Sequence, residues 1–306
     1  MKNSELSYQA HKNNLLRKVM NEKDQRLSSI KNKDCINYQL VKKYLNILHP
    51  FLFKQSNWLT IGDYNGLEAN YLLEQGQHAV ASDITDVFLQ EAHKEGLIQQ
   101  YREINVEDID LPDDSFDYVL CKEAFHHFPK AYLGLYEMIR CSRNATILIE
   151  PIDIITKMPL LLFIKNILDR FNPLLINKLW RNRFSFETVG NYVFKISERE
   201  IEKVAMGLGF PCIAFKKINL MLNVKLDKAI TAQTPIHKKG WKKINRRLSF
   251  KDLLGYLRII PYNHLCCVVF KTDPDLQTRK RLKKAGYMVI ELPENPYLKR
   301  MAEITY

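Results

Sequence analysis

Two glycines and a carboxylate are the first residues in this sequence whose types and spacing could bind a ligand. Gly62 and Gly66 bracket a short turn between an apolar run and a segment of helical composition, and Asp83 closes a second apolar run 21 residues after Gly62. Glycine lets the backbone approach a ligand closely. A carboxylate at the end of the second strand can accept hydrogen bonds from both hydroxyls of a ribose. Residues 58–83 therefore predict a β-α-β unit that holds a nucleoside.

The spacing of the glycines decides against a dinucleotide. The pattern for such a cofactor is G-x-G-x-x-G. Counting from Gly62, the second and third of these positions hold Tyr64 and Leu67. A G-x-x-x-G spacing, from Gly62 to Gly66, remains. An ordinary turn between a strand and a helix has the same spacing, so other residues must identify the ligand.

Apolar runs alternate with segments of helical composition along the first half of the chain. We expect strands at residues 58–61, 78–82, 100–104, 116–121 and 145–149. Five strands that alternate with helices predict a parallel, doubly wound sheet, whose ligand-facing loops share the edge at the carboxyl ends of the strands. Asp83, Asn105, Glu123 and Glu150 all follow expected strands and should meet at that edge.

A second motif lies in residues 105–128. It reads D-D-S-F-D-Y-V from Asp113 to Val119 and ends with the pair His126 and His127. Together with the glycine turn, this segment resembles the class I methyltransferases that use S-adenosylmethionine, and in particular their type 11 branch. That branch runs from an acidic stretch through D-x-S-F-D-x-V to a His-His pair. The resemblance covers residues 56–151.

The resemblance implies both a fold and a cofactor. The fold is Rossmann-like, a seven-stranded, mostly parallel sheet with helices on both faces, here with helical insertions and a C-terminal extension. The cofactor is S-adenosyl-L-methionine. Its implied binding residues are Gly62, Asp63, Gly66, Asp83, Ile84, Asn105, Val106, Glu107, Lys122 and Glu123.

Several of these positions depart from the family pattern or have particular roles. The family form of the first motif is an acid followed two residues later by G-x-G-x-G; here Thr60 replaces the acid, and Asp63 is a candidate to supply the missing carboxylate. Asn105 stands where the family usually has Asp and would accept from the adenine amino group, with the next two backbone groups near the ring nitrogens. Lys122 and Glu123 would lie near the methionine end.

The two histidines are the candidates for catalysis. Methyl transfer is an in-line displacement on an activated cofactor, so positioning supplies much of the rate. A hydroxyl or amine acceptor can still need a base to take its proton, and a histidine has a suitable pKa. We expect His127 to be this base and keep His126 as a second candidate. The competing interpretation is that the histidines hydrogen-bond their loop together. The six cysteines lack C-x-x-C spacing, so we expect neither a metal site nor disulfides.

The chain divides into four expected parts. These are an N-terminal helical arm at 1–50, the cofactor-binding half at 51–151, the rest of the sheet with substrate-covering insertions at 152–273, and a helix–strand extension at 274–306. The third part should contain antiparallel strands at 212–215 and 265–270, a capping box from Ser197 to Glu200, and an aromatic segment at 184–196 that lines the acceptor pocket. The extension should add an edge strand at 287–292.

The insertion also contains a strongly apolar segment with periodic Lys and Arg. Leu160, Ile164, Ile167 and Leu168 fall on one helical face. We expect a helical cap that buries this face on the sheet domain. A helix that lies in a membrane interface is the alternative.

Charge is unevenly distributed along the 306 residues. Residues 1–150 hold 17 Lys and Arg against 21 Asp and Glu, a net charge of −4, whereas residues 151–306 hold 29 against 13, a net charge of +16. The basic half could face nucleic acid, an anionic membrane or an anionic small molecule, or could be solvated surface. No run reaches the ~18 apolar residues of a membrane span, and the N-terminus lacks the apolar core of a signal peptide.

Our prediction is a cytoplasmic methyltransferase that acts on a small-molecule or carbohydrate acceptor, such as a glycan precursor, with negative charge on the acceptor or its carrier. An RNA methyltransferase is one alternative, and peripheral membrane contact is a further expectation from the insertion. A methyltransferase-like binding module, inactive because its glycine motif has decayed, is the alternative from another class. The sequence leaves the oligomeric state open.

Overall fold

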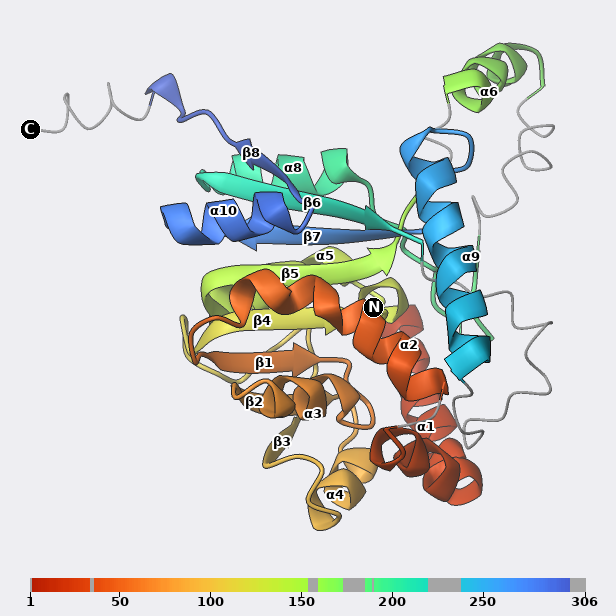
Figure 1. The fold of residues 1–306 in the computed structure, drawn as a ribbon, viewed down its shortest axis with the longest axis vertical. Helices are drawn as coiled ribbons and strands as arrows, with labels where there is room; N and C mark the ends of the chain where they lie inside the picture. Colours follow the sequence, from red (N-terminus) through yellow and green to blue (C-terminus); the bar gives the residue numbers. More distant parts are fainter. Residues whose placement is uncertain are drawn as a thin grey trace, which may run out of the picture.

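A computed structural model describes residues 2–33, 36–153, 159–172, 185–188, 190–219 and 238–297. One eight-stranded sheet, in the order β3-β2-β1-β4-β5-β7-β6-β8, forms its centre (Figure 1). The strands are β1 (Asn57–Ile61), β2 (His78–Asp83), β3 (Gln100–Glu103), β4 (Phe116–Lys122), β5 (Ser142–Pro151), β6 (Cys212–Ile218), β7 (His264–Phe270) and β8 (Met288–Glu291). All five strands expected in the first half of the chain form, and they pair in parallel.

The order of the parallel strands creates a switch point beside β1. The chain moves outward from β1 to β2 and β3, then returns to place β4 on the other side of β1. The chain therefore leaves β1 and β4 toward opposite faces of the sheet. Ligands of open α/β sheets bind at such a point.

The last three strands complete the sheet with antiparallel pairing. β7 pairs with both β5 and β6, as expected for strands six and seven, and β8 pairs with β6 at the edge. The seven-stranded sheet of the prediction thus has eight strands, because the edge strand expected in the C-terminal extension joins it. The Rossmann-like fold is confirmed.

Helices cover both faces of the sheet. The helices of the described residues are α1 (Lys2–Lys31), α2 (Ile36–Leu45), η1 (Asn46–Phe51), α3 (Leu67–Glu74), α4 (Val87–Lys94), η2 (Phe125–His127), α5 (Ala131–Cys141), α6 (Pro159–Phe171), α8 (Glu198–Gly207), α9 (Lys238–Tyr256) and α10 (Leu276–Lys284), and all but α6 lie close to the sheet or to its covering helices (Figure 1). One buried core lies under α2, α3 and α10, and contains Leu45, Leu72 and Leu282. A second core lies under α5 and α8, and contains Leu135 and Ile201. Apolar burial on both sides of the sheet holds the strand ends in place.

The start of α8 shows how a local sequence signal fixes an element. The Ser197 side chain accepts from the backbone N–H of Glu200, and the Glu200 carboxylate accepts from the backbone N–H of Ser197 at 2.8 Å. This reciprocal capping box, which was predicted, satisfies two backbone donors that a helix start otherwise leaves without partners.

The helix expected in the insertion forms as α6, but it does not bury its apolar face as predicted. Ile164 and Leu168 of the predicted face are half-buried. Leu160 and Ile167 of that face expose 70% and 43% of their surface, and Phe163 and Phe171 of the same helix expose 63% and 78%. In Figure 1, α6 stands apart from the sheet and from the helices that cover it. The expectation of a cap packed on the sheet domain is therefore wrong for these side chains.

Candidate functional site

A cavity of about 590 Å³ lies at the carboxyl ends of β1, β2 and β4. Of the residues predicted from the sequence, those that line it are Gly62, Asp83, Ile84, Val106, Glu123 and His127. We call this part of the lining, apart from His127, the sheet side. Helix α1, through residues that include Tyr8 and His11, and the segment 185–188, through Phe186 and Glu187, also line the cavity, and together with His127 we call them the covering side.

The turn after β1 depends on the absence of a side chain at Gly62. Its φ angle is +71°, and a Cβ atom there would lie 2.2 Å from the Cβ of Ala124, in the loop after β4. Gly66 also has a positive φ, and its Cβ would lie 2.8 Å from Ile98. Gly62 thus lets the loops after β1 and β4 meet, and Gly66 lets the same turn pack on the segment before β3, although Gly66 is not among the residues that line the cavity.

Asp63 and Lys122 lie behind the cavity lining. The carboxylate of Asp63 is fully buried, where it accepts from the hydroxyl of Thr60 at 2.9 Å and from the backbone N–H of Ala69 at 2.8 Å, at the start of α3. Burial, and then the neighbouring Glu68, raise its pKa. Lys122 reaches Glu68, with Nζ 2.8 Å from Oε1. Asp63 and Lys122, both predicted to bind the cofactor, therefore stabilise the turn between β1 and α3 in this structure.

Asp83 presents a buried carboxylate to the cavity. Its Oδ1 atom has no hydrogen-bond partner among the described residues. Burial raises the pKa of Asp83 to about 7, although the backbone N–H groups of Thr85 and Ile84 favour the charged form. A buried acceptor that lacks a donor fits a ligand that brings hydroxyl groups of its own.

The loop after β3 uses its polar side chains to hold itself together. Asn105 Oδ1 accepts from the backbone N–H of Glu107 at 3.1 Å, and Glu107 accepts from the backbone N–H of Lys130 at 2.6 Å. Val106, between them, lines the cavity. An amide oxygen has a second lone pair, so the contact of Asn105 with an adenine amino group stays a prediction.

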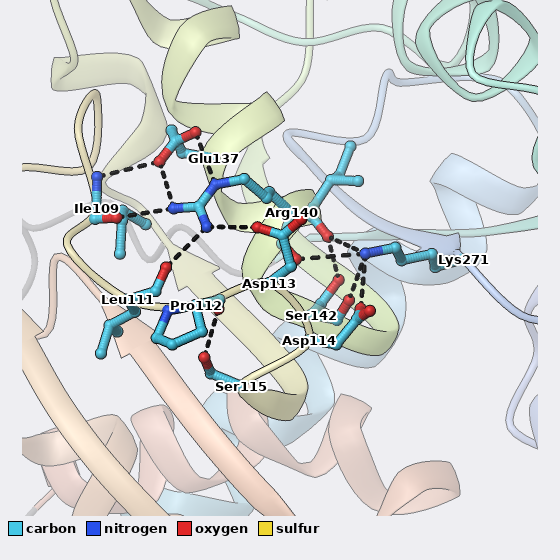
Figure 2. Close-up of polar contacts among 11 residues, drawn as sticks. Ile109, Leu111, Pro112, Asp113, Asp114, Ser115, Glu137, Arg140, Ser142 and Lys271 are labelled. Carbon is cyan, nitrogen blue, oxygen red and sulfur yellow. Dashed lines mark hydrogen bonds and ion pairs between the residues drawn. The ribbon is translucent and has the colours of Figure 1, made fainter.

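Arg140 of α5 fixes the segment that follows this loop, as Figure 2 shows. Its guanidinium donates to the carbonyl oxygens of Ile109 and Leu111, both at 2.7 Å, and to the carboxylate of Glu137. Glu137 also accepts from the backbone N–H of Ile109 at 3.1 Å. The planar guanidinium thus satisfies two backbone carbonyls at once, which a lysine could not do in the same geometry.

Asp113 and Asp114, the acidic residues of the second motif, also help to hold this segment in place. Asp113 accepts from Arg140 at 2.8 Å, and Asp114 accepts from Lys271 Nζ at 2.7 Å (Figure 2). Lys271 directly follows β7, so the pair ties the motif to both α5 and the far strands. These carboxylates act as braces and lie outside the cavity lining.

His126 is held by a buried carboxylate. Its Nδ1 lies 2.6 Å from Glu150 Oε2, and Glu150 Oε1 accepts from the backbone N–H groups of Ala124 and Phe125. Burial opposes protonation of His126, but the hydrogen bond and charge of Glu150 raise its pKa above the ordinary value. A histidine held as the cationic partner of a carboxylate is a poor base, and the geometry fits the interpretation that this histidine secures the loop.

His127 has the opposite electrostatic setting and lines the cavity. Its Nδ1 lies 2.8 Å from Glu187 Oε2, and His11 Nε2 lies 3.6 Å from the same oxygen. Burial, and then the positive charge of His126, lower the pKa of His127 despite the opposing charge of Glu187. His127 is therefore neutral near pH 7, as a general base must be.

Glu187, His11 and His127 also have the residue types of a metal site. Each offers one ligand atom, and these atoms lie within 4.8 Å of one another. Two imidazoles and a carboxylate can hold a divalent metal ion in this arrangement. In this structure a direct hydrogen bond already joins Glu187 to His127.

Glu123 and Tyr64 complete the sheet side. Burial opposes ionisation of Glu123, yet the hydrogen bond with His264 and the charge of Lys122 lower its pKa to about 2. Its carboxylate is thus a fixed negative charge on the cavity lining. Tyr64, at the family's middle glycine position, packs its ring edge-to-face on Phe88, with 5.6 Å between centroids. This contact draws the Tyr64 ring toward α4.

Sequence reasoning did not identify His11 and Glu187 as neighbours of His127. They lie 116 and 60 residues from His127, and no local motif links them. The expectation that residues 184–196 line the cavity did point to this segment, and it holds for Phe186, Glu187 and Thr188. Phe184 lies outside the described residues.

Comparison with known families agrees with this geometry. Residues 59–149 match the model of the type 11 family of methyltransferase domains. The chain carries a class I methyltransferase domain. This methyltransferase domain runs from β1 to β5, the part of the sheet whose strand ends form the cavity, and it uses S-adenosylmethionine as its cofactor.

Several solved structures are similar to this methyltransferase. A SAM-dependent methyltransferase from Archaeoglobus fulgidus is 15% identical, covering 76% of this chain and 94% of its own, with a TM-score of 0.48. The 1,6-didemethyltoxoflavin-N1-methyltransferase of Burkholderia thailandensis, solved with that compound and S-adenosylhomocysteine, is 15% identical over 82% and 87%, with a TM-score of 0.46. A Haloferax volcanii methyltransferase in complex with the activator Trm112 is 13% identical over 82% and 94%, with a TM-score of 0.48. Curated proteins give no match.

Proposed function

We propose that this methyltransferase acts on a small-molecule or glycan-precursor acceptor that carries negative charge, with His127 as the base that takes the acceptor's proton. The observation that carries the proposal is that one cavity is lined both by the buried carboxylate of Asp83 and by the His127–Glu187 pair. A nucleoside-binding group and a neutral histidine thus face the same space.

The sheet side has the groups that the cofactor needs. Asp83 would accept from the ribose hydroxyls, because its Oδ1 is buried and has no donor among the described residues. The ionised Glu123 would face the methionine ammonium group. Val106 would supply backbone contacts to adenine, and Gly62 gives the cofactor close access to the backbone.

His127, together with Glu187, would carry out the proton transfer. With its proton on Nδ1, His127 donates to Glu187, and Nε2 then keeps a lone pair. The bound cofactor supplies a methyl group activated on its sulfonium. As the acceptor oxygen or nitrogen bonds to the methyl carbon and the carbon–sulfur bond breaks, His127 takes the acceptor's proton. Glu187 acts through His127 as a positioning residue that stabilises the resulting imidazolium.

The covering side favours a small acceptor over RNA. The cavity volume lies within the range of roughly 300–1,000 Å³ that is typical of small-molecule sites. Phe186 and Tyr8 add aromatic surface beside the histidines. The anionic character of the acceptor rests on the net charge of +16 in residues 151–306.

The test is a methyl-transfer assay with labelled S-adenosylmethionine on a panel of sugar phosphates, nucleotide-sugars, lipid-linked sugar phosphates and transfer RNA. We expect label in one of the first three classes and none in the RNA. Mass spectrometry of the purified protein serves as the control for cofactor binding. Label found only in RNA would replace the proposal with the RNA methyltransferase, and a protein that binds no cofactor would identify an inactive binding module.

The same assay separates a base from a metal centre. We expect the chelator EDTA to leave the rate unchanged, because the proposed reaction needs no metal ion. A rate that is lost with EDTA and restored by Zn²⁺ would show instead that His11, His127 and Glu187 act as metal ligands.

A further inference from the structure

α9 presents one exposed face that changes character along its length. Its first turns expose basic side chains, namely Lys242, Lys243, Arg246 and Arg247. Its last turns, and the residues just after it, expose apolar side chains, namely Phe250, Leu253, Tyr256, Leu257 and Ile259. We call these nine residues the α9 face.

The opposite side of α9 attaches the helix to the protein. Leu248 is completely buried. Asn245 accepts from Lys43 of α2 at 2.9 Å, and Asp252 accepts from the backbone N–H of Asn219 at 3.3 Å. The single acidic residue of α9 is thus engaged on the attached side, so the α9 face has no carboxylate to offset its basic groups.

The apolar part of the α9 face is unusually exposed for a soluble surface. Phe250 exposes 59% of its surface, Tyr256 78% and Ile259 60%. Single exposed apolar residues are normal, but a contiguous group rimmed by polar residues marks an interaction site. Basic residues next to aromatic and aliphatic ones are the composition of helices that lie in a membrane interface.

We propose that the α9 face docks on the surface of an anionic lipid bilayer. Charge complementarity selects this partner, because these four exposed cations, which form no ion pair with an acid of the described residues, attract anionic headgroups. The aromatic and aliphatic side chains would then enter the headgroup boundary. Among the described residues, no helix is both long and apolar enough to cross a membrane. The contact is therefore peripheral, with the helix lying on the membrane.

Two other partners fit the α9 face less well. RNA would satisfy the basic residues and could stack bases on Phe250 and Tyr256, but it would leave the aliphatic Leu253, Leu257 and Ile259 in water. A second copy of the chain would cover the apolar residues, but it would bring a second basic cluster without acids to pair with it. Only an anionic bilayer matches both halves of the face.

The exposed apolar residues of α6 independently support docking on a membrane. It exposes Phe163 and Phe171 on the side of the molecule where α9 also lies, beyond the carboxyl ends of the parallel strands (Figure 1). The cavity opens at those same strand ends. Docking there would bring the cavity close to the bilayer, and this consequence, which rests on the proposed function, favours a lipid-linked sugar phosphate among the anionic acceptors.

Vesicle flotation tests the docking without cofactor or acceptor. The full chain is mixed with vesicles of phosphatidylcholine alone, or of phosphatidylcholine with about a third of phosphatidylglycerol. We expect the protein to float with the anionic vesicles and to be released when salt is raised from about 0.1 M to about 1 M, since the screening length falls from about 10 Å to about 3 Å. Protein that ignores both vesicle types would overturn the proposal and leave the methyl-transfer assay unaffected.

Substitution of the basic residues should weaken binding selectively. Lys243→Ala with Arg246→Ala removes two cations, and at about fivefold per charge we expect a loss of roughly 30-fold in affinity for the anionic vesicles. The matched control is Lys280→Ala with Lys283→Ala, which removes two exposed lysines from α10, at the other end of the sheet (Figure 1). Equal losses in both variants would mean that net charge, and not the α9 face, drives the binding.

Substitution of the apolar residues tests insertion separately. Phe250→Ala with Leu253→Ala should lower vesicle affinity about tenfold or more, because this apolar area would no longer leave water. Leu276→Ala, at an exposed leucine of α10, is the control and should change nothing. If the Phe250 and Leu253 variant instead abolishes a dimer seen by light scattering, the face is an interface between copies. If it lowers binding to transfer RNA while vesicles remain unbound, the partner is RNA.

Discussion

The two sides of the cavity are built in different ways. The sheet side comes from consecutive strands and their loops, within residues 61–127. Gly62 permits the close approach of the loops after β1 and β4. The covering side combines α1 with the segment 185–188, and residues as distant as His11 and Glu187 converge on His127. The sheet side is thus built from neighbouring strands and loops of the fold, whereas the covering side is assembled by packing between segments that are far apart in the sequence.

The electrostatics of the two histidines follow from this difference. His126 points to Glu150 at the end of β5, inside the sheet framework, and its pKa is raised. His127 points to Glu187 on the covering side, and its pKa is lowered. Adjacent residues of the same type therefore have distinct electrostatic settings, which fit a structural role for His126 and the proposed role of a base for His127.

The largest expected effect is a loss of turnover from a substitution on the covering side. His127→Asn keeps hydrogen-bonding capacity but removes a base of suitable pKa, so we expect kcat to fall by roughly 10²- to 10⁴-fold. The affinity for S-adenosylmethionine should stay unchanged, because the cofactor contacts lie on the sheet side. Steady-state kinetics and calorimetry on the same preparation measure both quantities. His78→Asn, at an exposed position at the start of β2, is the control.

A His127→Asn enzyme that turns over at the wild-type rate would move the base elsewhere or show that none is needed. Glu187→Gln refines the result. It keeps the shape of the partner but removes the charge that stabilises the imidazolium, so the pKa seen in the kcat profile should fall. A purely structural role for Glu187 would lower the amount of folded protein and leave that pKa in place.

The next effect concerns the sheet side, where Gly62→Ala tests the contact between two loops. The new Cβ would lie 2.2 Å from Ala124, and the residue would keep a φ near +71°. The two costs, about 1–2 kcal/mol for the backbone and about 1–3 kcal/mol for overpacking, should lower the free energy of unfolding by about 2–5 kcal/mol. Gly76→Ala has a similar φ of +76° with nothing within 4 Å, so it should lose only the backbone part.

Denaturant titration of both variants measures the difference. Equal destabilisation would mean that the loop after β4 moves away readily, and the close approach of the two loops would then be incidental. A Gly62→Ala protein that is destabilised as expected should also bind S-adenosylmethionine more weakly, since the displaced loop carries Glu123 and Ala124.

The contrast also explains what the sequence could predict. Gly62 and Asp83 were found because strand ends, turn glycines and a spacing of 21 residues are local signals. Ser197 and Glu200 were found for the same reason. Glu187 and His11 could not be found, because their proximity to His127 is created by tertiary packing. The expectation that α6 buries its apolar face failed for a related reason. A 3.6-residue period shows that an apolar face exists, but it does not show what covers that face.

Asp83→Ala tests whether the sheet side holds the ribose. Loss of a charge-assisted hydrogen bond typically costs about 1.5–3 kcal/mol, so affinity for S-adenosylmethionine should fall by roughly 10- to 100-fold. Asp86→Ala, three residues further along the same loop, is the matched control and should bind normally. Calorimetry decides the assignment, and an Asp83→Ala protein with wild-type affinity and an intact fold would contradict it.

The smallest expected effect is the pH dependence of cofactor binding. It should come from Asp83 on the sheet side and not from His127 on the covering side. Burial raises the pKa of Asp83 to about 7 from its ordinary value of 3.8. Ribose hydroxyls donate to the ionised carboxylate, so binding should release a proton below pH 7, and affinity should rise about tenfold between pH 6 and pH 8.

The effect on stability has the opposite sign. A raised pKa means that the folded protein without cofactor binds more protons than the unfolded chain between about pH 4 and pH 7. The contribution of Asp83 to stability is therefore lost as the pH rises through that window. Calorimetry in buffers of different ionisation enthalpy counts the released proton. Asp83→Asn should abolish both trends, whereas His127→Asn should leave them in place. If the His127 substitution removes the pH dependence, the titrating group belongs to the covering side and the two sides are coupled.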